Sequence, residues 1–543
     1  MANTIRTSAL VTSLALLCGT SLFAWNDSPQ PRLSHASAFA AGQISAMAAQ
    51  RSVSLSLPAE SNRTPSSEFN LVYHVLGLGN GFPNFNVPSP PPNPTLAVGG
   101  SEVIQAAGGF YSDFDKSTGA IIPLNGQDST LGNTIWHELL PGTSCANSNI
   151  DNGELLIKFD RAASRWIVTQ NNFLSYAVCI AVSQTATFSD NLWYAYQFPV
   201  FQAGFPDYTK WGVWSTGAAS DGYYQTWNNF GPGGNGYQGP VICGYHRAKL
   251  LVGDSSAEQI CFQLTVNESS LLPADVDSPV GPPATEDEFF IGSVDAVDNS
   301  HLSLYSMHIN DWATGNATMT GLNNSQLIAV APYMGACNGQ FGGNCVPQPG
   351  GSDLASLGDR LMYRFAYWND QPSPTVTAAP PIPPPLQHWL VNFSVESSTG
   401  QIGVRWFEFI ASHRTIPVTS LSVFQQGTFA GSPADTNYRW MGSIARDNVQ
   451  NFLLGYSILS SSMFPSIALA GRKYGDPQGT LSGEQFALTG GGAQDSSPWG
   501  QYSTMEIDPS DNCTFFYTTE YYMMTAVSDW STDISSWKFP NCH

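Results

Sequence analysis

The sequence predicts an all-β protein that folds as a single β-propeller of about seven four-stranded blades. Composition is the first reason: aromatic residues make up 12% of the 543-residue chain and charged residues only 11%, with 50 Gly and 37 Pro. This balance favours strands and turns, because the strong helix formers Lys, Glu and Arg are scarce. The second reason is a recurring hairpin, and the third is a series of short predicted strands without a clean domain break.

The recurring hairpin consists of a strand, a polar turn opened by Asp, and a second strand rich in aromatic and β-branched residues. Its clearest copy spans Pro498–Tyr522, and two others span Leu155–Phe173 and Gly442–Ile458. An Asp side chain at the start of a turn accepts hydrogen bonds from the backbone that follows it. We therefore expect Asx turns at Asp160, Asp447 and Asp508.

The first 67 residues are expected to lie outside the folded domain. Residues 1–24 have the features of an export signal, because Arg6 supplies positive charge and residues 10–23 are mostly apolar. Residues 25–67 are rich in Ala, Ser, Pro and Gln without a sustained pattern, which predicts a flexible low-complexity segment. The propeller domain should then cover residues 68–543 of a secreted or periplasmic protein.

Strand-forming runs fill this domain in sets of four. The most regular set is 154–159, 165–173, 177–185 and 192–198. The other sets are 102–107, 109–115 and 120–124; 210–215, 222–230, 240–246 and 259–265; 288–294, 302–309, 317–322 and 326–331; 360–367, 389–395, 402–409 and 420–426; 440–445, 452–457, 467–470 and 485–488; and 502–507, 513–519 and 534–539.

The last set has only three strands, and an isolated strand is predicted near the N-terminus at Phe69–Val75. If the first and last blades share strands, the ring closes and exposed sheet edges disappear. A tandem array of β-sandwiches is the alternative architecture.

Eight cysteines remain once Cys18 is removed with the leader, and an even number in an exported chain predicts disulfides. A zinc site would need Cys-x-x-Cys-like spacing, which is absent. Spacing favours pairing between sequence neighbours, namely Cys145–Cys179, Cys243–Cys261, Cys337–Cys345 and Cys513–Cys542.

The formal net charge of −21 argues against nucleic acid and anionic membranes as partners. Motifs for nucleotide binding, serine hydrolases and zinc proteases are absent from the sequence. No cofactor or metal is assigned. Calcium is an open alternative wherever turn oxygens converge, and the densest acidic cluster is Asp151, Asn152 and Glu154.

Several distinctive motifs are spread along the chain. They are FPDYTKWGVW at 205–214, DRLMYR at 359–364, RWMGS at 439–443 and WGQYS at 499–503, followed by DP, CTF and EY at 508–509, 513–515 and 520–521. Together they resemble a large group of exported bacterial β-propeller proteins without an assigned activity. The resemblance covers roughly residues 94–542 and implies an extracellular propeller, but no established reaction.

Two positions depart from the pattern of that group. Gln501 stands where the group usually has Asp, and Phe393 stands where His is common. Any metal binding or proton transfer at these positions in the group would therefore be lost or altered in this chain.

Arginines in the late blades are candidate ligand-binding residues, because a guanidinium within a sheet must be paired or face water. Facing a central funnel, such groups would hold a carboxylate or sulfate of an acidic glycan in bidentate fashion. The alternative is that they bridge blades through carboxylates or backbone carbonyls. Asp207 and Lys210, which flank a turn before a strand, are added to these arginines. The candidate ligand-binding residues are Arg360, Arg364, Arg405, Arg439, Asp207 and Lys210.

Glu520 and Tyr521 end the final hairpin, and such a pair can act as base and nucleophile or proton donor. Glu408 is a third candidate catalytic group. A sialidase-like hydrolase would use these residue types with an arginine triad, although the S-x-D-x-G-x-x-W turns of that class are missing. A polysaccharide lyase would need a Tyr or His beside a cation, which by type alone suits Tyr245, His246 and Arg247.

The leading hypothesis is a secreted propeller that binds an extracellular glycan or a cell-surface protein through its axial face. A carbohydrate-active enzyme acting on an acidic polysaccharide and a structural surface component are the alternatives. The enzyme is favoured if Arg360, Arg405, Arg439 and Glu520 converge in one axial pocket, and disfavoured if each is locked in its own blade.

Overall fold

The computed structural model describes residues 31–43, 68–146, 154–172, 176–293, 299–322, 325–340, 342–370, 387–411, 418–432 and 434–543. Its regular structure is almost entirely β, as the sequence predicts. The expected export signal at residues 1–24 lies outside the described residues. No helix in the described ranges is long and apolar enough to cross a membrane.

The strands form antiparallel groups in which consecutive strands pair. The first three groups are β4 (Thr95–Val98), β5 (Glu102–Ala107), β6 (Phe110–Asp115), β7 (Ile121–Ile122) and β8 (Thr130–Leu131); β9 (Leu155–Asp160), β10 (Arg165–Asn172), β11 (Ala177–Ser183) and β12 (Leu192–Pro199); and β13 (Phe205–Trp214), β14 (Gly222–Gly231), β15 (Asn235–His246) and β16 (Glu258–Gln263).

Four further groups complete the set. They are β17 (Leu272–Val276), β18 (Glu288–Ser293), β19 (His301–Asp311), β20 (Asn316–Thr320) and β21 (Gln326–Ala329); β24 (Met362–Asn369), β25 (Gln387–Glu396), β26 (Ile402–Ala411) and β27 (Leu421–Phe429); β28 (Tyr438–Arg446), β29 (Phe452–Ser460), β30 (Met463–Arg472) and β31 (Ser482–Leu488); and β32 (Thr504–Ile507), β33 (Thr514–Tyr521), β34 (Ser531–Lys538) and β3 (Asn70–Leu76).

Smaller elements lie between these groups. A two-stranded ladder joins β22 (Asn344–Val346) to β23 (Leu354–Ala355). The short helices are α1 (Thr134–Leu139), α2 (Arg247–Leu250), η1 (Phe188–Asp190), η2 (Phe201–Ala203), η3 (Pro232–Gly234) and η4 (Ala336–Gly339).

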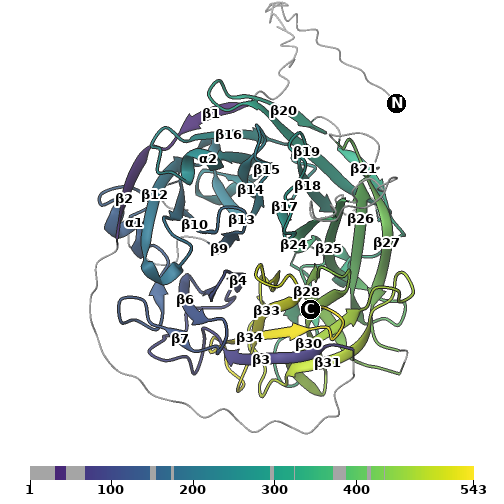
Figure 1. The fold of residues 1–543 in the computed structure, drawn as a ribbon. Coiled ribbons are helices and arrows are strands. Elements are labelled where there is room, and N and C mark those ends of the chain that lie inside the picture. The colour runs from purple at the N-terminus through teal and green to yellow at the C-terminus, as the bar shows by residue number, and fades with distance from the viewer. Residues whose placement is uncertain are drawn as a thin grey trace, which may run out of the picture.

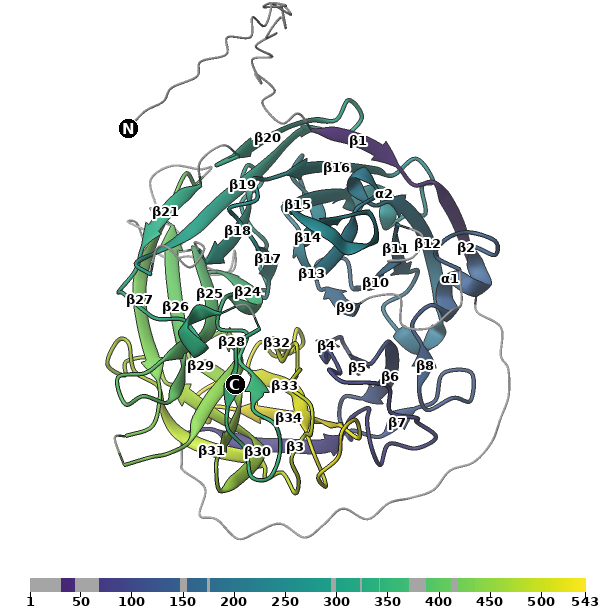
Figure 2. The same ribbon diagram turned by 180° about the vertical axis from the view of Figure 1, so that it is seen from behind.

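The groups follow one another around a common centre, with the first strand of each group innermost (Figures 1 and 2). Neighbouring inner strands approach closely: a Cβ added at Gly212 of β13 would lie 2.1 Å from the carbonyl oxygen of Ala274 in β17. β17 also pairs in parallel with β24, which merges two groups into one nine-stranded sheet. The inner strands therefore bring distant parts of the chain to one place.

Two groups were assigned partly wrongly from the sequence. The predicted runs of the first group did not include its inner strand β4. In the other group the inner strand β17 was missed, because Pro273 is atypical of a central strand. In the structure β17 pairs with β18 over Leu272 and Pro273 only, with Pro273 opposite Phe290. The two runs predicted as third and fourth strands, β20 and β21, both pair with β19.

The N-terminal segment corrects another expectation. Within residues 25–67, which were expected to be flexible, β1 (Arg32–His35) pairs with β16 and β2 (Ala38–Gln43) pairs with β12. Both strands lie on the outer rim, where Figure 1 draws them in purple. Edge pairing uses backbone hydrogen bonds and needs no alternating apolar pattern, so the Ala- and Ser-rich sequence gave no sign of it.

The last group contains strands from both ends of the chain. β3 pairs antiparallel with β34 from Asn70↔Lys538 to Leu76↔Asp533. Buried Gln105 of β5 links this group to the first one: its side chain donates to the hydroxyls of Thr518 (2.7 Å) and Thr532 (2.8 Å) and accepts from the Leu78 N–H (2.7 Å). The predicted sharing of strands between the chain ends is confirmed by this pairing.

The predicted turns and disulfides are confirmed. Asp160, Asp447 and Asp508 each accept a backbone N–H two or three residues further on. All four expected disulfides form between sequence neighbours: Cys145–Cys179, Cys243–Cys261, Cys337–Cys345 and Cys513–Cys542.

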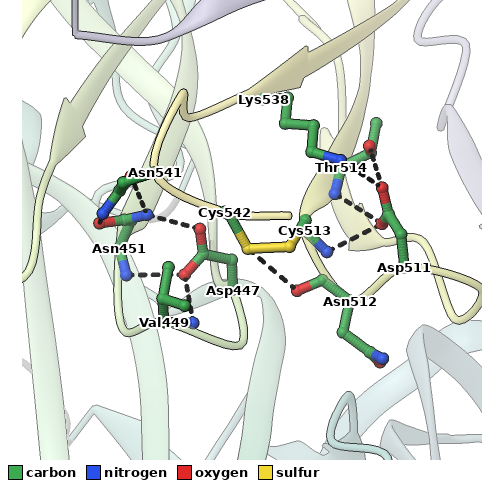
Figure 3. The surroundings of a disulfide bond; sticks show 10 residues. All are labelled: Asp447, Val449, Asn451, Asp511, Asn512, Cys513, Thr514, Lys538, Asn541 and Cys542. Carbon is green, nitrogen blue, oxygen red and sulfur yellow. Dashed lines mark hydrogen bonds and ion pairs between the residues drawn. A yellow bond between two sulfur atoms is a disulfide. The ribbon is translucent and has the colours of Figure 1, made fainter.

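The Cys513–Cys542 disulfide fastens the C-terminal tail to two turns (Figure 3). Asn541, next to Cys542, exchanges side-chain hydrogen bonds with Asn451. Asn451 in turn donates to the Asp447 carboxylate at 2.7 Å, within the β28–β29 turn of the neighbouring group. The tail thus ties the last group to the one before it.

Replacing Gln105 with Leu should lower the free energy of unfolding by about 1–3 kcal/mol, because the buried Leu78 N–H and two threonine hydroxyls lose their partner. Chemical denaturation would measure the loss, with exposed Gln127→Leu as the matched control. An unchanged midpoint for Gln105→Leu would contradict the role of this side chain.

Candidate functional site

Four of the distinctive motifs lie on inner strands of four different groups. FPDYTKWGVW, DRLMYR, RWMGS and WGQYS lie in or just before β13, β24, β28 and β32, whereas DP, CTF and EY follow β32 and lie in or next to β33. Residues near the starts of these strands contact one another, and residues further along do the same, so the inner strands run in the same direction. We call the end of the centre where the inner strands begin the entrance end.

The backbone is strained at this entrance end. Bulky residues rarely adopt positive φ, and such strain persists where the surrounding structure enforces it, often at functional sites. The strained residues are Tyr208 (φ 56°), Leu357 (φ 47°), Met441 (φ 53°) and Gln501 (φ 44°), each in or just before one of the four strands.

Lys210 is the central residue of the entrance cluster. Its Nζ lies 3.8 Å from the ring centroid of Tyr208 and 3.6 Å from that of Tyr502, so the ammonium is held between two aromatic faces. It also pairs with a carboxylate oxygen of Glu154 at 3.2 Å, and the Tyr502 hydroxyl donates to the other oxygen at 2.9 Å. The side chains around Lys210 therefore come from three separate strand groups.

Arg360 extends the cluster on the side of Tyr208. Its guanidinium lies over the Tyr208 ring at 4.8 Å and pairs with Asp359 at 2.6 Å. Asp207 acts electrostatically on both Lys210 and Glu154 and is only partly buried. We call Glu154, Asp207, Tyr208, Lys210, Asp359, Arg360 and Tyr502 the entrance cluster.

Burial controls the protonation of this cluster. It lowers the pKa of Lys210 to about 8, because attraction to Glu154 offsets only part of the desolvation. Burial also raises the pKa of Glu154, although Lys210 and the Tyr502 hydroxyl oppose the shift. The entrance cluster can therefore donate and accept hydrogen bonds and change its charge within a unit or so of neutral pH.

An ion network lies one layer deeper. Lys158 of β9 pairs with Asp275 of β17 and with Glu506 of β32 (2.8 Å), and Arg364 of β24 pairs with the same two carboxylates at 2.8 Å and 3.1 Å. Arg364 also pairs with Asp277. We call these five residues the axial ion network; it joins four of the inner strands.

The pKa of each aspartate in the network depends on how many cations it contacts. The attraction of Lys158 and Arg364 outweighs burial and holds the pKa of Asp275 below its usual range. Burial instead raises the pKa of Asp277 to about 7, because Arg364 compensates only part of the desolvation. Removing either cation would therefore leave buried carboxylates uncompensated.

The three carboxylates of this network are close enough to ligate a cation: one oxygen each from Asp275, Asp277 and Glu506 lies within 4.8 Å of the others. Oxygen donors of this kind suit calcium. However, each carboxylate is already bonded to Lys158 or Arg364. Two fixed positive charges occupy the space between the oxygens, so this donor set does not fit a divalent ion.

Only some of the predicted ligand-binding residues lie near the centre. Asp207, Lys210 and Arg360 belong to the entrance cluster, and Arg364 lies in the axial ion network. Arg405, in the third strand of its group, donates to the Thr428 hydroxyl and the Ala331 carbonyl. Arg439 pairs with Asp435 and Glu484.

The predicted catalytic residues do not meet. Glu520 and Tyr521 are adjacent in β33, and adjacent strand residues point to opposite faces. Glu520 is fully buried and accepts the Gly500 N–H at 2.5 Å, which fixes the turn leading into β32. Glu408 is bonded to His388 (2.7 Å) and Gln425 (2.6 Å) inside its own sheet.

The residues considered for a lyase also have structural partners. Tyr245 is buried and donates to Gln225 at 2.6 Å. His246 pairs with Glu258 and stacks on a Trp312 ring, and Arg247 pairs with Asp160 and Asp221. Convergence of Arg360, Arg405, Arg439 and Glu520 in one pocket, the criterion favouring an enzyme, is therefore not met.

Sequence reasoning missed Lys158, Asp275 and Glu506. A usable signal existed: each is a charged residue inside a short, otherwise mainly apolar strand, as in Leu155-Leu156-Ile157-Lys158. A charge buried in this way needs an opposite partner. Which strand supplies that partner could not be read from the sequence.

No protein-family model and no curated protein matches the chain. Among solved structures, a GH62 hydrolase in complex with xylotriose is similar, with 10% identity, coverage of 61% of this chain and 90% of the other, and a TM-score of 0.25. The phage phi92 endosialidase is similar with 7% identity, coverage of 86% of this chain and 69% of the other, and a TM-score of 0.36. An α-L-arabinofuranosidase from Fusarium graminearum is similar with 10% identity, coverage of 61% of this chain and 92% of the other, and a TM-score of 0.25. TM-scores this low support no conclusion about function.

Replacing Lys210 with Met should cost about 3–5 kcal/mol of stability, because Glu154 would remain buried without its cation. The double variant with Glu154→Gln should recover most of that loss. Denaturation of the four proteins of the cycle measures the coupling. Additive effects would show that the pair is not coupled.

Stability should fall as the pH rises from 5 to 9. Burial and the nearby Glu102 carboxylate raise the pKa of Asp113 to about 9, and burial raises those of Glu288 and Glu520 well above the usual range. When folding raises the pKa of an acid, the protein is most stable below the pKa of that acid in the unfolded chain, which is 3.8 for Asp113. This stability is lost as the pH rises toward the pKa of the acid in the folded protein. Thermal melting of Asp113→Asn should depend less on pH; an equally steep profile would contradict the assignment.

Proposed function

We propose that this protein is a secreted, closed seven-bladed β-propeller that binds an extracellular glycan through its entrance cluster. The seven strand groups, the inner position of the first strand in each group and the β3–β34 pairing support the closed ring. The four disulfides support export, because such bonds persist in oxidising compartments. The resemblance to exported propeller proteins without an assigned activity remains a prediction.

The observation that carries the proposal is the convergence of Glu154, Lys210 and Arg360 from separate groups at the strained starts of inner strands. Loops or strand ends that gather polar groups at one end of a rigid scaffold are typical of binding sites. The outer rim shows no comparable gathering of charges from several groups among the described contacts.

A glycan suits the chemistry of this cluster better than an ion does. A sugar hydroxyl both donates and accepts hydrogen bonds, so it can bridge a carboxylate and a neighbouring cation. Asp207 and Asp359 are partly accessible carboxylates beside Lys210 and Arg360, and Glu154 is partly accessible as well. This alternation of acceptors and donors matches a chain of hydroxyl groups, and a uronic acid could engage the cations in addition.

The enzymatic alternative, a hydrolase or lyase on an acidic polysaccharide, has weaker support. Its proposed catalytic groups Glu520, Tyr521 and Glu408 serve structural contacts in their own sheets. A catalytic role would have to be taken by residues of the entrance cluster, where Glu154 is already bonded to Lys210 and Tyr502.

A panel of neutral, uronic-acid and sialic-acid glycans would test the proposal by direct binding, with reducing-end and ultraviolet readouts for turnover. Asp207→Ala and Asp359→Ala should each weaken binding about tenfold, because each removes a charged hydrogen-bond partner. Asp254→Ala is the matched control, because the Asp254 side chain lies outside the entrance cluster and accepts hydrogen bonds from Ser256. Turnover would favour the enzyme, and the absence of binding by the unaltered protein would refute the proposal.

A further inference from the structure

Lys158 has an unusual environment for a lysine. It is 3% exposed, and its Nζ is surrounded by Asp275, a Glu506 oxygen at 2.8 Å and the Tyr363 hydroxyl at 3.0 Å. A lysine at the protein surface would have water as a partner, whereas this one has only protein groups. Binding a ligand at the entrance does not require it, so its chemistry has to be considered separately.

The two oxygens of Asp275 are held differently. Oδ1 accepts the Val213 N–H at 3.0 Å. Oδ2 contacts both Lys158 Nζ and Arg364 Nε, the latter at 2.8 Å. A backbone N–H on one oxygen polarises the carboxyl carbon, as oxyanion-type donors do. The amine that could attack this carbon lies against the other oxygen.

Glu506 is placed to move protons between these groups. Its Oε1 accepts from Lys158 at 2.8 Å and its Oε2 contacts Arg364 at 3.1 Å. A carboxylate within hydrogen-bond distance of a reacting amine can serve as general base and then as general acid. Lysine, acid partner and proton carrier therefore meet within one buried cluster, each from a different inner strand.

We propose that Lys158 and Asp275 condense into an intramolecular isopeptide bond, with Glu506 relaying the protons. Glu506 takes a proton from the ammonium, and the resulting amine attacks Cγ of Asp275 while Val213 N–H stabilises the charge on Oδ1. The Nζ–Cγ bond forms and the Cγ–Oδ2 bond breaks. Oδ2 leaves as water with two protons of the former ammonium, one of them delivered by Glu506, which returns to its carboxylate form; nothing is oxidised or reduced.

Burial favours this condensation. An ion pair removed from water carries a desolvation cost, and the amide product replaces one positive and one negative group. Glu506 loses Lys158 as a charged partner in the product and keeps Arg364, which also pairs with Asp277. Exclusion of water also disfavours hydrolysis of the product. The bond would join β9 to β17 across a sequence separation of 117 residues, so it would cross-link two groups that are not consecutive.

Mass spectrometry of the reduced and denatured protein tests the proposal. The unaltered chain should weigh one water molecule less than its sequence, and digestion should yield a branched peptide that joins Lys158 to Asp275. Glu506→Gln should keep its full mass, because the proton relay is lost. The adjacent Asp277→Asn is the matched control and should retain the branched peptide.

Two results would overturn the proposal. A full-mass unaltered protein with separate Lys158 and Asp275 peptides would show that the pair is only ionic. A branched peptide that persists in Glu506→Gln would remove Glu506 from the reaction. A thermal melt of each variant confirms that the compared proteins are folded.

Discussion

The pairing of β3 with β34 is the constraint on which the rest of the structure depends. It builds one sheet from both ends of the chain, and Gln105 then binds that sheet to the first group through two threonine hydroxyls. Without this junction the inner strands would have no common centre to face. The C-terminal disulfide and the Asn541–Asn451 contact tie the same sheet to the preceding group.

Bringing inner strands together creates an electrostatic problem at the centre. Side chains from several sheets meet there with little water, so each charge needs a partner from another sheet. The axial ion network places Lys158 and Arg364 between three carboxylates, and only Asp277 is incompletely compensated. The entrance cluster pairs Lys210 with Glu154 and Arg360 with Asp359, while Asp207 remains partly accessible. The network holds the inner strands together, and the entrance cluster is the proposed ligand site.

The sequence predicted features that depend on local chemistry. Asx turns at Asp160, Asp447 and Asp508, most strand positions and all four disulfides follow from residues close together in the chain. Features set by distant partners were missed: the edge strands β1 and β2, the inner strands β4 and β17, and the charges of the axial ion network. Glu520 and Tyr521 were paired because they are sequence neighbours, whereas the alternation of a strand separates them. Arg360 was found as one of the arginines in the late blades, and Lys210 as a residue beside a turn that precedes a strand.

Hydrogen–deuterium exchange of the peptide containing residues 70–76 tests the proposed closed ring most directly. If β3 is the edge strand that completes the last sheet, the amides that face β34 should be protected, whereas residues 531–538, paired on both sides, should be protected throughout. Exchange of residues 70–76 at the rate of an unstructured chain, with residues 531–538 still protected, would contradict the closed arrangement.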